Sequence, residues 1–136
     1  TNQWALHHID LPEIQKYVDL VNLMAYDFSG PWCHTAGHHA QFCPVQEGEN
    51  SGSAVVEYIL STGFPGKKIL LGVPLYERSF IGAASPCDQY HINGGDDGMF
   101  EYNALPRTGT QEIVDAAGCA AMEGIAGRRA LVDCFT

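Results

Sequence analysis

Two nearly continuous apolar runs constrain the fold of this chain more than any other feature. One run covers residues 20–25 and the other residues 69–75. Because neither run alternates polar and apolar side chains, both are typical of strands buried on both faces of a parallel sheet. Between them, residues 55–60 place apolar side chains along one helical stripe. We therefore expect a strand, a helix and a second strand, with parallel strands and a right-handed crossover.

The helix between the two runs has recognisable ends. Ser51 or Ser53 can cap its first turn, and Gly63 suits the left-handed residue that commonly follows a helix. An earlier helix is expected over residues 11–17, because Asp10 is a good N-cap and Pro and Glu follow in the first turn.

A long connection follows the first strand. Residues 29–52 are rich in Gly, Pro, His, Ser and Asn and show no period, and loops of this length usually carry function. Parallel strands place their carboxyl ends at one edge of the sheet. Tyr26 and Asp27, after the first strand, are therefore expected near Tyr76 and Arg78, after the second.

The pattern changes beyond residue 80. We divide the chain into residues 1–80 and residues 81–136, and expect the second part to be α+β, with many turns. A short helix is predicted over residues 111–117, and no element is assigned to the Ala- and Gly-rich end. The acidic pair Asp96 and Asp97 is interpreted as a solvated turn.

Charge and hydropathy limit the partners. The 136 residues include 7 basic and 16 acidic side chains, which gives a net charge of −9. Such a chain has no basic face for nucleic acid, and a neutral or cationic ligand suits it better. No apolar stretch approaches the roughly 18 residues that a membrane helix needs, so no membrane association is expected.

The cysteines and histidines leave two possibilities open. The five cysteines are an odd number without a C-x-x-C pair, which argues against a zinc ribbon and against a complete disulfide framework. A bridge between Cys33 and Cys43 would fit across the long connection. Together with His34, His38 and His39 these cysteines also invite a zinc site, but their spacing matches no structural zinc pattern, and no metal is expected.

Two parallel strands cannot bury both of their faces and both of their edges. The missing strands must come from elsewhere, and because the sequence begins with Thr rather than Met, we expect it to be an internal piece of a longer chain. A TIM barrel of about 250 residues places polar groups after the carboxyl ends of its strands, which is where they gather here.

Several motifs resemble one family, in chain order. They are LVNLMAYDFSGPW (20–32), GHHAQ (37–41), KKILLGVPLYERSF (67–80), DGMFEYNALP (97–106) and TQEIVD (110–115). They resemble the sixth strand, its loop, the seventh strand and the inserted α+β domain of glycoside hydrolase family 18, most closely the fungal-type chitinases. The fold implied is α/β, a partial (β/α)8 TIM barrel with an inserted α+β domain.

The resemblance also implies a function. Family 18 chitinases hydrolyse β-1,4-linked N-acetylglucosamine polymers with retention, and the acetamide group of the substrate itself attacks the anomeric carbon. The expected partner is therefore chitin or its oligosaccharides, without a cofactor, and the expected location is extracellular.

The resemblance assigns roles residue by residue. Tyr26 and Asp27 would hydrogen-bond the acetamide group, as a phenol and a carboxylate in a water-poor cleft can. Met24 would pack under the sugar, and Arg78 would bind hydroxyls or acetamide in the neighbouring subsite. Apart from the resemblance, the aromatic ring of Trp32 could equally stack on a sugar face or pack in the core.

These assignments have structural alternatives. Met24 and Tyr76 are equally candidates for substrate contact and for a hydrophobic core. Asp27 also suits a loop cap, and Arg78 also suits a surface ion pair with Glu77 or Asp27, which would contribute little.

The chain departs from the family in three places. The D-x-x-D-x-D-x-E motif with the general acid does not occur, Glu77 replaces the usual Gly, and the aromatic strand expected after Asp115 is absent. We therefore expect that this chain alone hydrolyses nothing. The alternatives are a non-catalytic carbohydrate-binding relative and a truncated gene product.

Overall fold

A computed structural model describes residues 2–83, 87–90, 99–106, 108–125 and 130–134. The α-helices are α1 (Gln3–Leu6), α2 (Leu11–Ile14) and α3 (Gly52–Ser61), and 3₁₀ turns cover Gly66–Lys68 and Tyr102–Ala104. The strands are β1 (Val21–Leu23), β2 (Ile69–Leu71), β3 (Tyr76–Ile81), β4 (Met99–Glu101), β5 (Thr110–Asp115), β6 (Ala120–Ile125) and β7 (Ala130–Cys134). The predicted turn at Asp96 and Asp97 lies outside the described residues.

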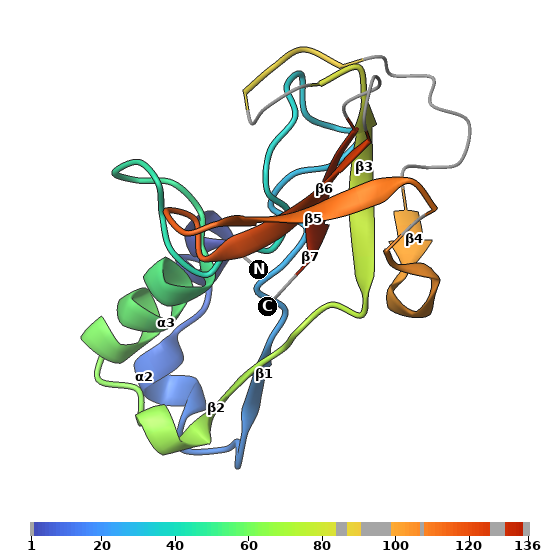
Figure 1. The fold of residues 1–136 in the computed structure, drawn as a ribbon. Coiled ribbons are helices and arrows are strands. Elements are labelled where there is room, and N and C mark those ends of the chain that lie inside the picture. Colours follow the sequence, from blue (N-terminus) through green and yellow to red (C-terminus); the bar gives the residue numbers. More distant parts are fainter. Residues whose placement is uncertain (1, 84–86, 91–98, 107, 126–129, 135–136) are drawn as a thin grey trace.

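The predicted strand, helix, strand unit is confirmed. β1 and β2 pair in parallel, with Val21 opposite Ile69 and Leu23 opposite Leu71, and α3 lies between them in the chain. Figure 1 shows α2 and α3 side by side along one flank of this pair. A buried aliphatic and aromatic core joins the helices to β1; its members are Leu6, Leu11, Leu23, Val55, Ile59 and Phe64.

Both predicted helix starts are confirmed. The Ser51 hydroxyl accepts a hydrogen bond from the Ala54 amide at 3.2 Å, and Gly63 follows α3 with a φ of 85°. Asp10 caps α2 by accepting from the Glu13 amide at 3.0 Å. This second helix ends at Ile14, earlier than predicted.

The other face of the β1–β2 pair is exposed, and on it Leu70 lies opposite the polar Asn22. Leu70 is 46% exposed, and Met24 and Val73, just beyond the strand ends, are 57% and 51% exposed. At the end of β2 the Gly72 amide donates to the Leu23 carbonyl at 2.8 Å. A Cβ at Gly72 would lie 2.8 Å from that oxygen, so only glycine allows this approach.

The remaining strands form one antiparallel sheet in the order β4-β3-β7-β6-β5 (Figure 1). The apolar run at residues 69–75 therefore contains only a short parallel strand, and the chain leaves the first sheet at Gly72. β3 starts at Tyr76 and belongs to the second sheet, although the predicted division at residue 80 assigns it to the first part of the chain.

The helix predicted over residues 111–117 is wrong. Residues 110–115 form β5, which pairs with β6 from Thr110 opposite Ile125 to Asp115 opposite Ala120. β-Branched Thr110, Ile113 and Val114 fit a strand, and the pairing with β6 overrides the weak local helical pattern. The turn after β5 is built by Asp115, whose carboxylate accepts from the amides of Ala117 and Gly118.

The long connection is irregular, as predicted, and the second sheet holds it in place. Phe80 of β3 packs with Ala36 and Ala83, and Tyr90 and Met122 pack against this cluster. The Cys33–Cys43 bridge that the spacing left possible is not formed.

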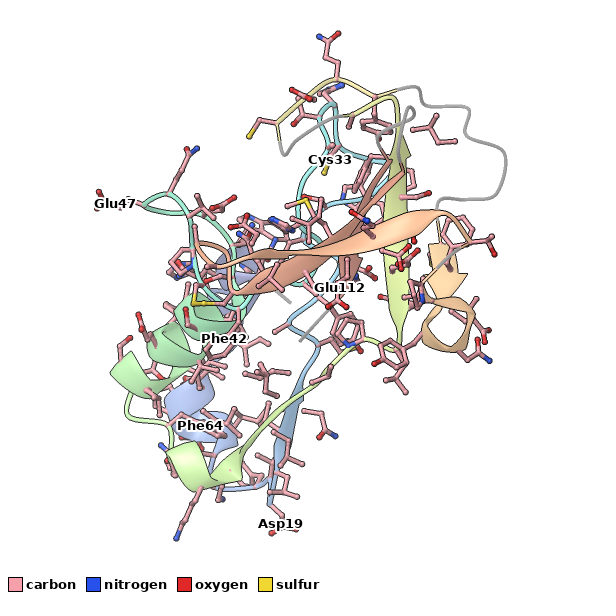
Figure 2. All side chains as sticks on the ribbon, viewed as in Figure 1. Asp19, Cys33, Phe42, Glu47, Phe64 and Glu112 are labelled. Carbon is pink, nitrogen blue, oxygen red and sulfur yellow. A yellow bond between two sulfur atoms is a disulfide. The ribbon has the colours of Figure 1, made fainter. Side chains whose placement is uncertain are left out.

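Cys43 instead bonds Cys119 in the β5–β6 turn, 76 residues later. The spacing of the cysteines along the chain could not predict the Cys43–Cys119 pairing, because the β5–β6 hairpin folds back onto the long connection. Cys33 is a free thiol and lies well away from Phe42, the neighbour of Cys43, in Figure 2. Among the described residues no helix is long and apolar enough to cross a membrane.

Candidate functional site

The predicted meeting of the two strand ends is confirmed, and it produces a charged pair. Asp27 follows β1 and accepts a hydrogen bond on Oδ1 from Arg78 Nε of β3 at 2.7 Å. Arg78 is only 7% exposed. The Arg78–Asp27 ion pair that the sequence left open is therefore formed; its guanidinium is buried while the Asp27 side chain stays 36% exposed, and the pair joins the two sheets.

The backbone aims Asp27 at this contact. Asp27 has a φ of 59°, in the left-handed region that Asp and Asn tolerate better than most side chains. The next amide, of Phe28, donates to the His39 carbonyl at 2.9 Å and ties the turn to the long connection.

Two rings pack beside the carboxylate. The rings of Tyr76 and His39 have centroids 5.3 Å apart, and Tyr26 meets Tyr76 edge-on at 6.2 Å. His39 is fully buried, and its Nδ1 lies 3.6 Å from Asp27 Oδ1. The rings lie on one side of Asp27, whose side chain stays 36% exposed and lines an open pocket.

These neighbours keep Asp27 ionised. Burial alone would raise the pKa of this carboxyl group, but hydrogen bonds from Arg78 and Tyr76 and the charge of Arg78 outweigh it, so the pKa lies below its ordinary value. Conversely, burial and the hydrogen bond to Asp27 raise the pKa of Tyr76 well above its usual range. Tyr76 is therefore a neutral donor and Asp27 an acceptor at neutral pH.

Arg78 also contacts an indole. Its guanidinium carbon lies 4.8 Å from the centre of the Trp32 ring and 5.7 Å from that of Tyr76. Trp32 also packs tightly over Gly30, where an added Cβ would come within 2.5 Å of the ring. Gly30 and Arg78 thus hold Trp32 in position, although 60% of it stays exposed.

An open pocket of about 350 Å³ lies in front of this arrangement. Its lining residues are Asn2, Trp4, Ala5, Tyr26, Asp27, Phe28, Trp32 and Asn50. Aromatic faces, amides and one carboxylate suit a ligand with apolar faces and many hydroxyl or amide groups.

Of the predicted site residues, Tyr26, Asp27 and Trp32 line the pocket. Tyr76 contacts Tyr26, and Arg78 holds Asp27. Met24 lies beyond the end of β1, is mostly exposed, and is not among the described residues that line this pocket.

Comparison with known proteins decides the family. The sequence profile of glycosyl hydrolases family 18 matches residues 1–128. The chain belongs to glycosyl hydrolases family 18. Chitinase 1 of Aphanocladium album is 37% identical over 117 residues, and the sporulation-specific chitinase 2 of Saccharomyces cerevisiae is 29% identical over 132. These matches cover 79% and 81% of this chain but only 27% and 25% of the relatives, so the chain spans about a quarter of their length.

Solved structures show the same relationship. The family 18 chitinase of Cycas revoluta, solved in complex with (GlcNAc)3, superposes with a TM-score of 0.80 at 25% identity, over 94% of this chain and 38% of that one. The chitinase ChiW of Paenibacillus shares the fold with a TM-score of 0.84 at 20% identity, over 97% of this chain and 16% of that one. The chain therefore has the fold of part of family 18 chitinases, a TIM-barrel family.

Some residues of the candidate site in this family 18 chain were not predicted from the sequence. Asn2, Trp4 and Asn50 reach the pocket from segments with no motif, and only their polar or aromatic character was visible. His39 lies inside the recognised GHHAQ segment, but nothing in the sequence separated it from the neighbouring histidines as a site residue. No cluster of three or more His, Cys, Asp or Glu side chains fit to hold a metal occurs in the part of the chain that the structure describes.

Proposed function

We propose that this chain forms one wall of the chitin-binding cleft of a family 18 chitinase. The observation that carries the proposal is the Asp27–Arg78 pair, held beneath an open, aromatic-lined pocket where the two sheets meet. β1 and β2 correspond to about the sixth and seventh strands of the barrel, and residues 81–136 to most of the inserted domain.

The exposed face of β1–β2 supports the barrel part of this proposal. Leu70 and Val73 leave about half of their surface in water, and a parallel sheet is normally covered on both faces. In a complete barrel the other strands would supply residues that cover this face.

The substrate is a β-1,4-linked N-acetylglucosamine oligomer. The Tyr26 hydroxyl donates to the acetamide oxygen, and the Asp27 carboxylate, kept ionised by Arg78, accepts from the acetamide N–H. Tyr76 and His39 fix the orientation of Asp27. Trp32 offers its exposed ring surface to a sugar. Arg78 and Met24 are not among the described residues that line this pocket, so Arg78 acts there through Asp27, and a contact of Met24 with the sugar would lie outside it.

In the whole protein these contacts would serve hydrolysis with retention, in which the oriented acetamide oxygen attacks the anomeric carbon. The general acid motif does not occur in these 136 residues, so the chain by itself is expected to release no sugar. The Cys43–Cys119 disulfide is typical of oxidising compartments and supports an extracellular location.

The same pocket would also serve a chitinase-like protein that binds without hydrolysis. The two functions are separated by reading the transcript upstream of the codon for Thr1. An in-frame D-x-x-D-x-D-x-E supports the chitinase, and a closed frame or a replaced Glu supports the binding protein.

Binding of (GlcNAc)4 to the 136-residue chain tests the proposal, measured by calorimetry. Asp27→Asn is the informative variant, because Asn tolerates the left-handed backbone at this position while removing the charge. We expect at least a tenfold loss of affinity, as a charged hydrogen bond contributes about 1.5–3 kcal/mol.

The matched control is Asp19→Asn, an exposed carboxylate before β1 and thus at the opposite end of this strand (Figure 2). Thermal unfolding followed by circular dichroism verifies that all three chains fold. Equal affinity of Asp27→Asn and the parent chain, or no binding by the parent chain, contradicts the proposed function.

A further inference from the structure

The pocket contains two indole rings, and they differ in how far their surfaces are already used. Trp32 has Gly30 packed against it and the Arg78 guanidinium 4.8 Å from its ring centre. Trp4, on α1, is 72% exposed, and its recorded ring contact is an edge-on one with His8, with centroids 4.9 Å apart. Trp4 therefore presents the larger unused aromatic surface to the pocket.

Contacts of α1 with the rest of the molecule set the position of Trp4. Asn2 caps α1 by accepting from the Ala5 amide at 3.0 Å, and Leu6 is buried in the same core as α3. Gln3 Nε2 also reaches the Ala54 carbonyl of α3. A short helix, capped by Asn2 and anchored to the core and α3 through Leu6 and Gln3, holds the indole at the rim of the pocket.

The rim has the chemistry of a sugar site. A pyranose ring has an apolar C–H face, which stacks on an indole, and equatorial hydroxyls, which bond to amides. Asn2 and Asn50 line the same pocket as Trp4, and about 350 Å³ lies within the range of pockets that hold small ligands.

We propose that Trp4 is a carbohydrate-stacking residue that binds the sugar next to the one whose acetamide group Tyr26 and Asp27 hold. The inference rests on the proposed function, because continuity with Tyr26 and Asp27 in one pocket identifies the occupant as the same oligosaccharide. Trp4 then determines how many sugar units contribute to the affinity.

The test compares (GlcNAc)4 with the monomer. Trp4→Ala is expected to weaken binding of (GlcNAc)4 about tenfold and to leave the weak binding of N-acetylglucosamine within twofold, since the monomer is held by Tyr26 and Asp27. Trp4→Phe, which keeps an aromatic face, is expected to recover most of the affinity. Tyr17→Ala is the matched control, because Tyr17 is 78% exposed and is not among the lining residues of this pocket.

A second measurement does not depend on a loss of affinity. The chain has two tryptophans, so in a Trp32→Phe background the fluorescence reports Trp4 alone. Saturation with (GlcNAc)4 is expected to shift its emission to the blue, as the sugar covers the indole.

The inference is overturned if Asp27→Asn weakens (GlcNAc)4 binding while Trp4→Ala does not, or if saturation leaves the Trp4 emission unchanged. Those results would instead assign Trp4 to a contact with polypeptide, and they leave the proposed function standing. Failure of the proposed function is a different result, in which Asp27→Asn has no effect or the parent chain binds no oligomer.

Discussion

The two sheets of this chain are held by different kinds of contact. The β1–β2 pair packs against its helices through aliphatic side chains such as Val55 and Ile59, both fully buried. The five-stranded sheet meets the long connection through the smaller apolar cluster of Phe80 and Ala36. It is also joined to the connection by the Cys43–Cys119 disulfide, a hydrogen bond from the Cys43 amide to the Gly118 carbonyl, and the pair of His38 and Asp115.

The difference shows how the site is made. The larger hydrophobic core sets the parallel strands and so fixes Asp27, while a smaller apolar cluster together with covalent and polar links places the second sheet and so fixes Arg78. The site lies where these two regions meet, and it needs both.

Removal of the disulfide is expected to have the largest effect. The bond closes a loop with a separation of 76 residues, for which chain entropy predicts a contribution of about 4 kcal/mol. Cys43→Ala/Cys119→Ala should lose most of this free energy of unfolding. Hydrogen exchange should speed up in β5 and β6 before it does in α3.

Free thiols provide the control for this experiment. Cys33→Ala/Cys87→Ala removes two unbonded cysteines and should change the free energy of unfolding little. If the disulfide variant is as stable as this control, the second sheet is not held as described.

Truncation of a side chain in the hydrophobic core is expected to have the second largest effect on the free energy of unfolding. Ile59→Ala should cost about 3 kcal/mol, because it leaves a cavity beneath the parallel strands. Leu70→Ala, on the exposed face of β2, is the matched aliphatic control and should cost less than about 1 kcal/mol. Chemical denaturation measures both, and equal costs would mean that both faces of β1–β2 are covered.

The parallel unit was predictable because its signals are local and strong. Two long apolar runs and a striped helix with Ser51 and Gly63 at its ends agree with one another, and the topology rule then places Asp27 near Arg78. The residue types at these positions gave the resemblance to family 18 as well.

The second sheet was not predictable, because its local sequence signals are weak. Residues 110–115 have no strong period, and their partner β6 lies in an Ala- and Gly-rich segment. The partner of Cys43 is distant in the chain, and Trp4 reaches the pocket only through the packing of α1. Such features are set by tertiary contacts, which no short window of sequence contains.

The smallest expected effect on stability is the pH dependence that the Asp115 carboxyl group contributes. The hydrogen bond from His38 is the main cause that lowers the pKa of Asp115 below its ordinary value of 3.8, helped by the amides of Gly118 and Ala117 against the effect of burial. A lowered pKa stabilises the fold above the ordinary pKa, and this stability is lost as pH falls through the lowered value.

Asp115→Asn should therefore be about 1 kcal/mol less stable than the parent at pH 7 and should lose less stability on acidification below about pH 4. Thermal unfolding at pH 7, 4 and 2 measures this. Parallel pH profiles for the two chains would contradict the role given to the His38–Asp115 pair.

The most direct test of the central claim is a titration of the ¹⁵N-labelled chain with (GlcNAc)4, followed by NMR. The amide shifts are expected to concentrate where the two sheets meet, at Tyr26, Asp27, Trp32 and Arg78. In Asp27→Asn the shifts at the other three residues are expected to become smaller at the same concentration of (GlcNAc)4. Shifts confined to the exposed face of β1–β2, or shifts that Asp27→Asn leaves unchanged, would contradict the claim that the joint between the two sheets is the sugar-binding site.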